Sequence, residues 1–478
     1  MADKPLLIPG VTTSAQPLQV RAPYDNQLIA TLDTADAAAV EQALATAHAL
    51  YRDRDRWLSG GERIRILQGT AELMTAEREE LARAAAGEGG KPLVDSLVEV
   101  DRAIDGVHNC IECVRGAAGR EIPMDINAAS TNRLALTRRE PVGVVVAVSA
   151  FNHPLNLIVH QVGPAVASGC PVIVKPAEDT PLSCYRFIEL LHQAGLPPEW
   201  AQALVVADLE VASQLVTDSR VGFFSFIGSA KVGWMLRSQL APGARCALEH
   251  GGAAPVIVAA DADLDSALSA LAKGGFYHAG QVCVSVQRVF AHKSIARQLA
   301  EDLAGLAQAL KVGDPTAEDT EVGPLIRPRE VERVAGWVTE AIDAGAECLT
   351  GGKPLSESCY APTVLFNPPD AAQVSQLEIF GPVVCVYEFD DIDAALIRAN
   401  SLPFAFQAAV YTRDLDTALK CYKRLDASAV MVNDHTAFRV DWMPFAGLRQ
   451  SGLGTGGIPY TYEDMTVEKL LVVKSDVL

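Results

Sequence analysis

One cysteine of this 478-residue chain occupies a position suited to nucleophilic chemistry. Cys283 closes the segment Gly-Gln-Val-Cys (280–283) and precedes an apolar, β-branched run that predicts a strand over 284–291. A thiol beside a flexible glycine at the end of a strand can meet a bound substrate, and as a thiolate it would attack an electrophilic carbon. A single cysteine is more often an inert packed side chain, so its position alone leaves both interpretations open.

Polar side chains beside three other apolar runs favour the catalytic interpretation. They are Asn152 and His153 after the run 142–149, Lys175 and Glu178 at the end of the run 172–175, and Glu249, which precedes a glycine pair and the run 255–258. Open α/β sheets build their sites at the carboxyl ends of their strands. We therefore expect a thiol, a carboxylate, an amide and an ammonium group to meet at such an edge.

The order and spacing of these segments resemble the aldehyde dehydrogenase superfamily over nearly the whole chain. Three further segments match the family: Phe-Ile-Gly-Ser-Ala-Lys-Val-Gly at 226–233, Glu-Ile-Phe-Gly-Pro at 378–382 and Pro-Phe-Ala-Gly-Leu-Arg-Gln-Ser-Gly at 444–452. The chain departs from the family pattern at three positions: His250 replaces a leucine, Ala253 a lysine and Ala446 a glycine. None of these changes removes a reacting group, and His250 is the one expected to alter the surroundings of Glu249.

The resemblance implies NAD(P)-dependent oxidation of an aldehyde to a carboxylic acid. Cys283 would attack the aldehyde to form a thiohemiacetal, which becomes a thioester when hydride passes to the nicotinamide. Glu249 would act as the general base that activates water for hydrolysis. The side-chain amide of Asn152 and the backbone N–H of Cys283 would hold the oxyanion. His153 is assigned to the substrate wall rather than to proton transfer.

The resemblance also assigns contacts with the dinucleotide. The residues concerned are Lys175, Glu178, Gly228, Ser229, Gly233, Glu378 and Phe380. The glycine turn at 226–233 opens a helix, whose amide groups would hold the pyrophosphate. Glu178 would accept the ribose hydroxyls and repel a 2′-phosphate, which favours NAD over NADP. No closely spaced cluster of His, Cys and Asp calls for a metal.

The elements that must position these groups alternate between strand and helix. Strands are predicted near 142–149, 171–175, 203–207, 221–227 and 254–259, and helices near 155–168, 181–194, 209–217 and 231–240. Such alternation indicates βαβ units and a mainly parallel sheet. Helices are also predicted over 35–54, with Thr34 as the N-cap, and over 61–85 and 91–117.

A second alternating series follows Cys283. Strands are predicted near 284–291, 382–388, 407–412 and 428–432, and helices near 294–310, 328–344, 391–400 and 414–425. The expected fold is α/β and aldehyde dehydrogenase-like, with a Rossmann-type cofactor domain, a second α/β catalytic domain and a small β oligomerisation flap. The domain boundaries are set at 1–119 with 141–251 for the dinucleotide, 252–446 for catalysis, and 120–140 with 467–478 for assembly into a homodimer or homotetramer.

Composition excludes several other classes of protein. The net charge of −19 disfavours nucleic acid and anionic membranes as partners. No apolar run is long enough to span a bilayer, and the first residues lack a signal peptide, so a cytoplasmic location is expected. Ten scattered cysteines fit a reducing compartment. Cys110 and Cys113 lie three apart in a predicted helix, which favours core packing over metal or redox chemistry.

The nature of the aldehyde depends on the segment 433–444. Arg439 lies there, and its guanidinium fork suits a carboxylate, phosphonate or phosphate on a small anionic or polar aldehyde. The competing interpretation is a structural salt bridge to Asp434 or Asp441, with a neutral aldehyde as substrate. Two alternatives to hydrolytic oxidation stay open: a CoA-acylating dehydrogenase, which generally lacks a glutamate at position 249, and a non-catalytic protein on the same fold.

Overall fold

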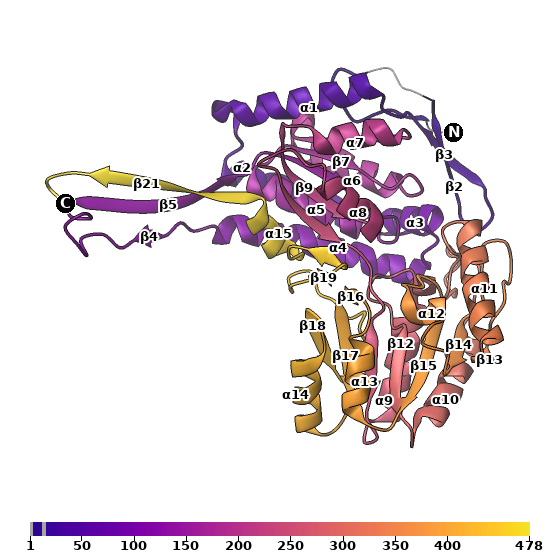
Figure 1. The fold of residues 1–478 in the computed structure, drawn as a ribbon. Coiled ribbons are helices and arrows are strands. Elements are labelled where there is room, and N and C mark those ends of the chain that lie inside the picture. Colours follow the sequence, from indigo (N-terminus) through magenta and orange to yellow (C-terminus); the bar gives the residue numbers. More distant parts are fainter. Residues whose placement is uncertain (1–2, 12–15) are drawn as a thin grey trace.

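The N-terminal half builds a sheet whose strands are apolar on both faces. The computed structural model describes residues 3–11 and 16–478, and this sheet lies in the upper body of Figure 1. In sheet order its strands are β20 (Gly452–Leu453), β10 (Arg245–Glu249), β9 (Val221–Ile227), β6 (Val144–Val148), β7 (Val172–Lys175) and β8 (Ala201–Ala203). Only β20 runs antiparallel to its neighbour. Strands covered on both faces read as near-continuous apolar runs, as the central strands β6, β7 and β9 do.

Alternation along the strands distributes the helices over the two faces of this sheet. Val144 and Val146 pack with one set of helices, and Val145 and Ala147 pack with the other. The first set is α1 (Ala37–Arg52), α7 (Leu209–Thr217) and α8 (Ala230–Arg237). The second is α2 (Gly60–Ala76), α3 (Arg78–Gly89), α4 (Leu93–Gly116), α5 (Asn156–Ser168) and α6 (Leu182–Gln193). A small sheet of β1 (Asp3–Lys4), β3 (Leu28–Leu32) and β2 (Leu18–Arg21) lies near the N-terminus.

The second sheet forms the lower body of Figure 1. Its order is β13 (Glu347–Thr350), β14 (Thr363–Phe366), β15 (Val383–Phe389), β12 (Arg288–His292), β11 (Pro255–Val258), β17 (Gln407–Tyr411) and β18 (Ala429–Val432). Only β13 is antiparallel to its neighbour. The accompanying helices are α9 (Leu264–Phe276), α10 (Ala296–Ala309), α11 (Pro328–Asp343), α12 (Gln373–Gln376), α13 (Ile392–Ala399) and α14 (Leu415–Arg424). These two sheets confirm the predicted α/β fold.

An antiparallel arm extends away from both bodies. It pairs β5 (Arg133–Pro141) with β21 (Thr466–Lys474) and with the short β4 (Glu121–Ile122), and it points to the left in Figure 1. Along β21 the apolar side chains of Leu470 and Leu471 are 53% and 58% exposed. The remaining short elements are β16 (Phe404–Ala405), β19 (Leu448–Arg449) and α15 (Ile458–Asp464).

Three local predictions are wrong, and one of them is the strand near 203–207, which lies earlier as Ala201–Ala203. The N-cap of α1 is Asp36, whose carboxylate accepts from the N–H of Ala39 at 2.8 Å, whereas the Thr34 hydroxyl donates to a backbone carbonyl outside the helix. The strand predicted over 284–291 begins only at Arg288. The residues just after Cys283 instead turn back toward the end of α9, where the N–H of Val286 donates to the carbonyl of Gly274 at 3.0 Å.

Among the helices of residues 3–11 and 16–478, none combines the length and the apolarity that a membrane span requires.

Candidate active site

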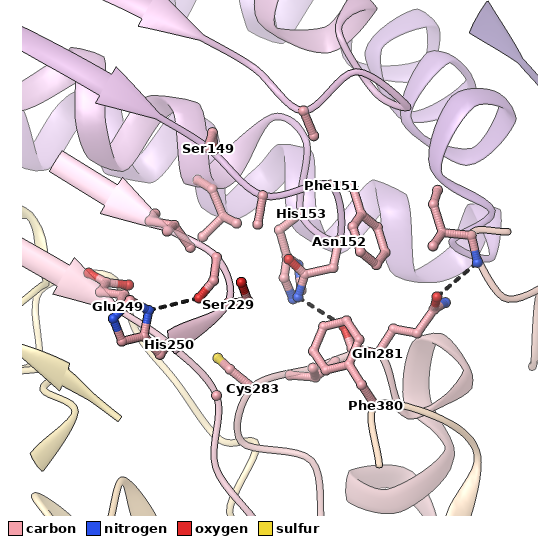
Figure 2. Close-up of a pocket in the computed structure, with 18 of the residues that line it drawn as sticks. Ser149, Phe151, Asn152, His153, Ser229, Glu249, His250, Gln281, Cys283 and Phe380 are labelled. Atoms are coloured by element: carbon pink, nitrogen blue, oxygen red, sulfur yellow. Dashed lines mark hydrogen bonds between the residues drawn. The ribbon is translucent and has the colours of Figure 1, made fainter. Parts of the chain in front are cut away.

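A cavity of about 610 Å³ collects nearly all of the residues that the sequence singled out. Its wall contains Cys283, Glu249, Asn152, His153, Arg439, Lys175, Glu178, Gly228, Ser229, Glu378 and Phe380. Figure 2 shows the loop at 151–153 facing the segment that carries Gln281 and Cys283. The carboxyl ends of β6, β7, β9 and β10 supply one side of the wall, and the chain between α9 and β12 supplies the other.

A left-handed turn directs Cys283 into this cavity. After α9, His278, Ala279 and Gly280 adopt φ of +49°, +54° and +69°. A Cβ at Gly280 would lie 2.1 Å from the carbonyl oxygen of Gly381, so only glycine fits there. The side chain of Gln281 then fixes the segment: its Nε2 donates to a backbone carbonyl at 3.2 Å, and its Oε1 accepts a backbone N–H at 2.9 Å.

The thiol of Cys283 is neutral in the resting protein. Burial raises its pKa to about 12; the guanidinium of Arg439 opposes this rise, and the carboxylates of Glu378 and Glu249 add to it. The thiolate is the reactive form of cysteine, so a base must remove the proton as the substrate is attacked.

Glu249 ends β10, and its carboxylate is the candidate base for removing the proton of Cys283. Its Oε1 lies against Gly456, where an added Cβ would come within 2.1 Å of it. Burial raises the pKa of this carboxyl above its ordinary value, while the charge of Arg439 opposes the rise. A carboxylate with a raised pKa is a stronger base at neutral pH than an exposed one.

Asn152 is held as an amide donor at the end of the β6 loop. Its side chain is 4% exposed, and Nδ2 donates to the carbonyl of Gln281 at 2.9 Å. One amide hydrogen is thereby used, and the second is left for a ligand. Behind the loop, Glu99 Oε1 accepts the N–H groups of Leu155 and Asn156 at 3.0 and 2.9 Å, which anchors the start of α5.

His153 turns its Nδ1 away from the cavity. This nitrogen lies 2.6 Å from the ammonium of Lys91, which also forms an ion pair with Glu99. Burial, together with the nearby charge of Lys91, lowers the pKa of His153 well below its ordinary value. The imidazole is therefore neutral.

Arg439 forms no ion pair with any residue that the structure describes. Its Cζ lies 3.6 Å from the centroid of the Phe445 ring, and Nη2 donates to His160 Nδ1 at 3.3 Å. Its Nε has no partner. Asp441, one of the two partners considered from the sequence, instead accepts two bonds from Arg102, at 2.7 and 3.1 Å. A largely uncompensated cation thus faces the cavity beside the thiol.

The other end of the cavity offers groups that fit a dinucleotide. Lys175 and Glu178 form an ion pair at 3.4 Å. Ser229 caps α8 without a side-chain bond, which leaves amide groups of the first turn for an anion. Burial raises the pKa of Glu378 to about 8, and its one bond, from the N–H of Gly252, is long at 3.3 Å. That carboxyl group is free to bond ribose hydroxyls.

Gly233 does not line the cavity. It packs beneath the ring of His250, which also contacts Phe226 and Trp234. The Nδ1 of His250 donates to the carbonyl of Gly228 at 2.8 Å, as Figure 2 shows. The histidine that departs from the family pattern therefore supports the glycine turn through its ring bond.

Three charged residues of α4 were not singled out from the sequence, and one of them, Arg102, lines the cavity. Asp95, Glu99 and Arg102 recur at helical spacing on the inner face of α4, where Asp95 is 4% and Glu99 2% exposed. A charged stripe on an otherwise apolar helical face is the signal that could have found them, because charges are rarely buried unless they are paired. Among the described residues, no group of three His, Cys, Asp or Glu side chains could hold a metal ion.

Comparisons with known proteins identify the family of the chain. Residues 11–471 match the model of the aldehyde dehydrogenase family. A 3-sulfolactaldehyde dehydrogenase of Priestia aryabhattai is 37% identical over 96% of this chain and 96% of its own. Aldehyde dehydrogenase 21 from Physcomitrella patens, solved with its product succinate, superposes with a TM-score of 0.94 at 33% identity over 99% of both chains. A glyceraldehyde-3-phosphate dehydrogenase of Methanocaldococcus jannaschii, solved with NADP, reaches 0.92 at 33% identity over 97% of this chain and 100% of its own.

Proposed function

The chain belongs to the aldehyde dehydrogenase family, and we propose that it oxidises a small anionic aldehyde to the carboxylic acid with NAD as acceptor. The observation that carries the proposal is the guanidinium of Arg439, which lies in the same cavity wall as Cys283 and has no carboxylate partner among the described residues. An enclosed, unpaired cation is costly unless a ligand supplies the opposite charge. Two relatives are named for sulfolactaldehyde and glyceraldehyde 3-phosphate, and a third was solved with its product succinate, and all three compounds are anionic.

In this proposal Cys283 and Glu249 carry the covalent steps. The thiol loses its proton to Glu249 as the sulfur bonds to the aldehyde carbon, and the carbonyl oxygen becomes an oxyanion. The free amide hydrogen of Asn152 and the N–H of Cys283 stabilise that oxyanion. When bound, NAD accepts the hydride that leaves this carbon. Glu249 releases the first proton to solvent and then takes a proton from water as the water oxygen bonds to the thioester carbon. The carbon–sulfur bond breaks to release the acid, and the departing sulfur regains a proton to restore the thiol.

The dinucleotide is assigned to the other end of the cavity. Lys175 and Glu178 would hold the adenosine ribose, the turn of Gly228 and Ser229 the pyrophosphate, and Glu378 the second ribose. Phe380, whose ring meets Phe151 edge-on at 5.8 Å, would pack near the nicotinamide. NAD is preferred because the Glu178 carboxylate repels a 2′-phosphate, although Lys175 partly offsets its charge.

Segments outside the cavity complete the proposal. The units 1–119 with 141–251 and 252–446 would bind the dinucleotide and carry the thiol, respectively. The exposed apolar face of β21 supports assembly through the arm into a homodimer or homotetramer. All ten cysteines are free, which supports a reducing compartment such as the cytoplasm.

The test is NADH formation from matched aldehydes of equal chain length that end in a carboxylate, sulfonate, phosphate or neutral group. We expect kcat/KM for the best anionic aldehyde to exceed that of its neutral match by about tenfold or more, the value of one charge-assisted hydrogen bond. Equal rates for both classes would contradict the proposal. The same assay with and without coenzyme A distinguishes hydrolytic oxidation from the CoA-acylating reaction. A CoA-acylating enzyme would require coenzyme A and would release an acyl-CoA.

A further inference from the structure

A fully enclosed ion pair lies behind the loop that carries Asn152 and His153. The side chains of Lys91 and Glu99 are 0% and 1% exposed, and their charged groups are in direct contact. Burying two charges is expensive, and a pair of this kind adds little to stability compared with apolar packing. The role of this ion pair must therefore be sought in the groups that it contacts.

The ammonium of Lys91 determines the tautomer of His153. An ammonium group has hydrogens to donate and no lone pair to accept with, so His153 Nδ1 must be the acceptor of the 2.6 Å bond. Burial lowers the pKa of Lys91, but the carboxylate of Glu99 opposes that shift and keeps a donor facing the ring. A neutral imidazole has one N–H, and when Nδ1 accepts, that hydrogen is on Nε2.

The Nε2–H of His153 is left for the cavity. Among the described residues, the bond to Lys91 is the only hydrogen bond of this ring, and the ring lines the cavity and stays partly accessible. Its neighbours Tyr277 and His278 lie at centroid distances of 6.1 and 6.2 Å and pack around it. Figure 2 shows His153 and Asn152 pointing from one loop toward the segment of Gln281 and Cys283.

We propose that the Nε2–H of His153 donates to a hydroxyl on the carbon next to the aldehyde, so that the preferred substrate is a 2-hydroxy aldehyde with an anionic far end. This inference rests on the proposed function. Asn152 would hold the aldehyde oxygen, and His153, which lines the same cavity from the same loop, would meet the substituent on the next carbon. Arg439, which reaches the cavity from the segment 433–444, would meet the far end. Lys91 is a positioning residue that acts through His153.

Two other roles for His153 do not fit the contacts. A general base needs a free lone pair facing the substrate, and the lone pair of this ring is at Nδ1, where Lys91 occupies it. An anion-binding role needs a positive charge, and the pKa of His153 is held well below its ordinary value. A neutral, oriented donor is suited to an uncharged acceptor such as a hydroxyl oxygen.

The decisive experiment compares two substitutions on a pair of substrates. The substrates are three-carbon aldehydes with a sulfonate on the third carbon, made with and without a hydroxyl on the second carbon. His153→Phe keeps a planar ring but has no donor, whereas His153→Gln places an amide N–H near the position of Nε2. We expect wild type to prefer the hydroxylated aldehyde, His153→Phe to lower the ratio of the two kcat/KM values by about three- to tenfold, and His153→Gln to restore part of it.

The result that overturns the inference is an unchanged ratio in His153→Phe, or a ratio that falls equally in His153→Phe and His153→Gln. Failure of the proposed function would look different, since wild type would then oxidise neither sulfonate well. Near-ultraviolet circular dichroism and NAD binding establish that each variant is folded before its ratio is compared.

The role of Lys91 is tested by a signature that a purely structural role would not change. The double variant Lys91→Met/Glu99→Gln removes both charges together and keeps an acceptor for the N–H groups of Leu155 and Asn156. In ¹⁵N-histidine spectra, the signals absent from His153→Phe identify this ring. We expect a pure Nε2–H pattern in wild type and a mixed or Nδ1–H pattern in the double variant. An unchanged pattern in the double variant, or a Nδ1–H pattern in wild type, would contradict the role of Lys91 in setting the tautomer of His153.

Discussion

The guanidinium of Arg439 lies flat over the ring of Phe445, with Cζ 3.6 Å from the ring centroid. The nearest histidine, His160, donates from Nε2 to Asp441 at 2.7 Å and so presents only a neutral Nδ1 to the arginine. Although burial alone would raise the pKa of Asp441, the bonds from His160 and Arg102 hold it well below its ordinary value. Asp441 is thus already paired, and the nearby charge of Glu249 acts on Arg439 without forming an ion pair, so the guanidinium is left without a bonded acid and can bind an anionic ligand.

Replacing Cys283 by Ala should abolish dehydrogenase activity, since the covalent step then has no nucleophile. Loss of a nucleophile costs orders of magnitude in turnover, so less than a few per cent should remain. NAD binding, measured by calorimetry, should stay close to wild type because the dinucleotide is assigned mainly to other residues. Cys348→Ala is the matched control, because that thiol lies on β13, in a different part of the second sheet. Substantial turnover in Cys283→Ala would refute the assignment.

Glu249→Gln should let the acyl-enzyme accumulate. An amide cannot take a proton from water, so hydrolysis of the thioester slows. The thiol of Cys283 must then lose its proton to water instead of Glu249, which slows the first NADH, but we expect this effect to be smaller than the effect on hydrolysis. Stopped-flow absorbance should show a burst of NADH followed by a steady state at least about a hundredfold slower than wild type. An unchanged steady-state rate would remove Glu249 from the mechanism. The raised pKa of this carboxyl also predicts that wild-type kcat/KM increases with pH above the ordinary range of glutamate, since only the ionised form is a base.

Glu178→Ser should narrow the preference for NAD over NADP. The substitution removes the carboxylate that repels a 2′-phosphate and frees Lys175 from its 3.4 Å ion pair. We expect the ratio of kcat/KM with NAD to that with NADP to fall by about three- to tenfold, since a partly exposed carboxylate no longer repels the 2′-phosphate. A wild-type enzyme that uses both cofactors equally would contradict this account.

Glu378→Gln should change how stability depends on pH. The folded pKa of this carboxyl is about 8 and its unfolded value is about 4.5, so between them the folded state holds a proton that the unfolded state releases. Wild-type stability therefore falls as pH rises through this window, and the amide, which does not titrate, should remove that part of the fall. The variant should gain about 2 to 4 kcal/mol relative to wild type between pH 5 and pH 8.5. If the free energies of unfolding of the two proteins changed in parallel with pH, Glu378 would not titrate between about pH 5 and pH 8.5.

Much of the fold and the placement of Asn152 follow from local sequence, whereas the role of Glu249 came from the family resemblance. The run 142–149 is apolar throughout because β6 is covered on both faces, and parallel strands bring their carboxyl ends to one edge. The side chains that follow β6 and end β10 must therefore meet near that edge. The strand β10 itself was not predicted, because Arg245–Glu249 lies near the edge of the sheet and is only partly apolar.

Contacts between distant segments could not be predicted in this way. The strand expected after Cys283 starts late because residues 284–286 bond to the end of α9, and nothing in their own composition reports that partner. The ion pair of Lys91 and Glu99 joins a loop to a helix. Its proposed role depends on contact with His153, which lies 62 positions from Lys91 in the sequence. Arg439 has no ion pair with Asp441 because Arg102 and His160 already bond to that carboxylate. The spacing of these residues along the chain does not reveal such contacts.

Arg439→Leu should selectively impair the oxidation of anionic aldehydes. Leucine fills similar space against Phe445 but removes the positive charge, so the ratio of kcat/KM for a carboxylate or sulfonate aldehyde to that for a neutral one of equal length should fall by about tenfold or more. Arg413→Leu is the matched control, because this arginine is 70% exposed, pairs with Asp263 at the surface and carries the same charge. The control should leave the ratio unchanged, which excludes an effect of net charge alone. Since the charge of Arg439 also opposes the raised pKa values of Cys283 and Glu249, its loss should slow the neutral aldehyde as well, and the ratio is therefore the informative quantity. An equal loss for both aldehydes would mean that Arg439 acts only through those two groups and that the anionic end of the substrate is bound elsewhere.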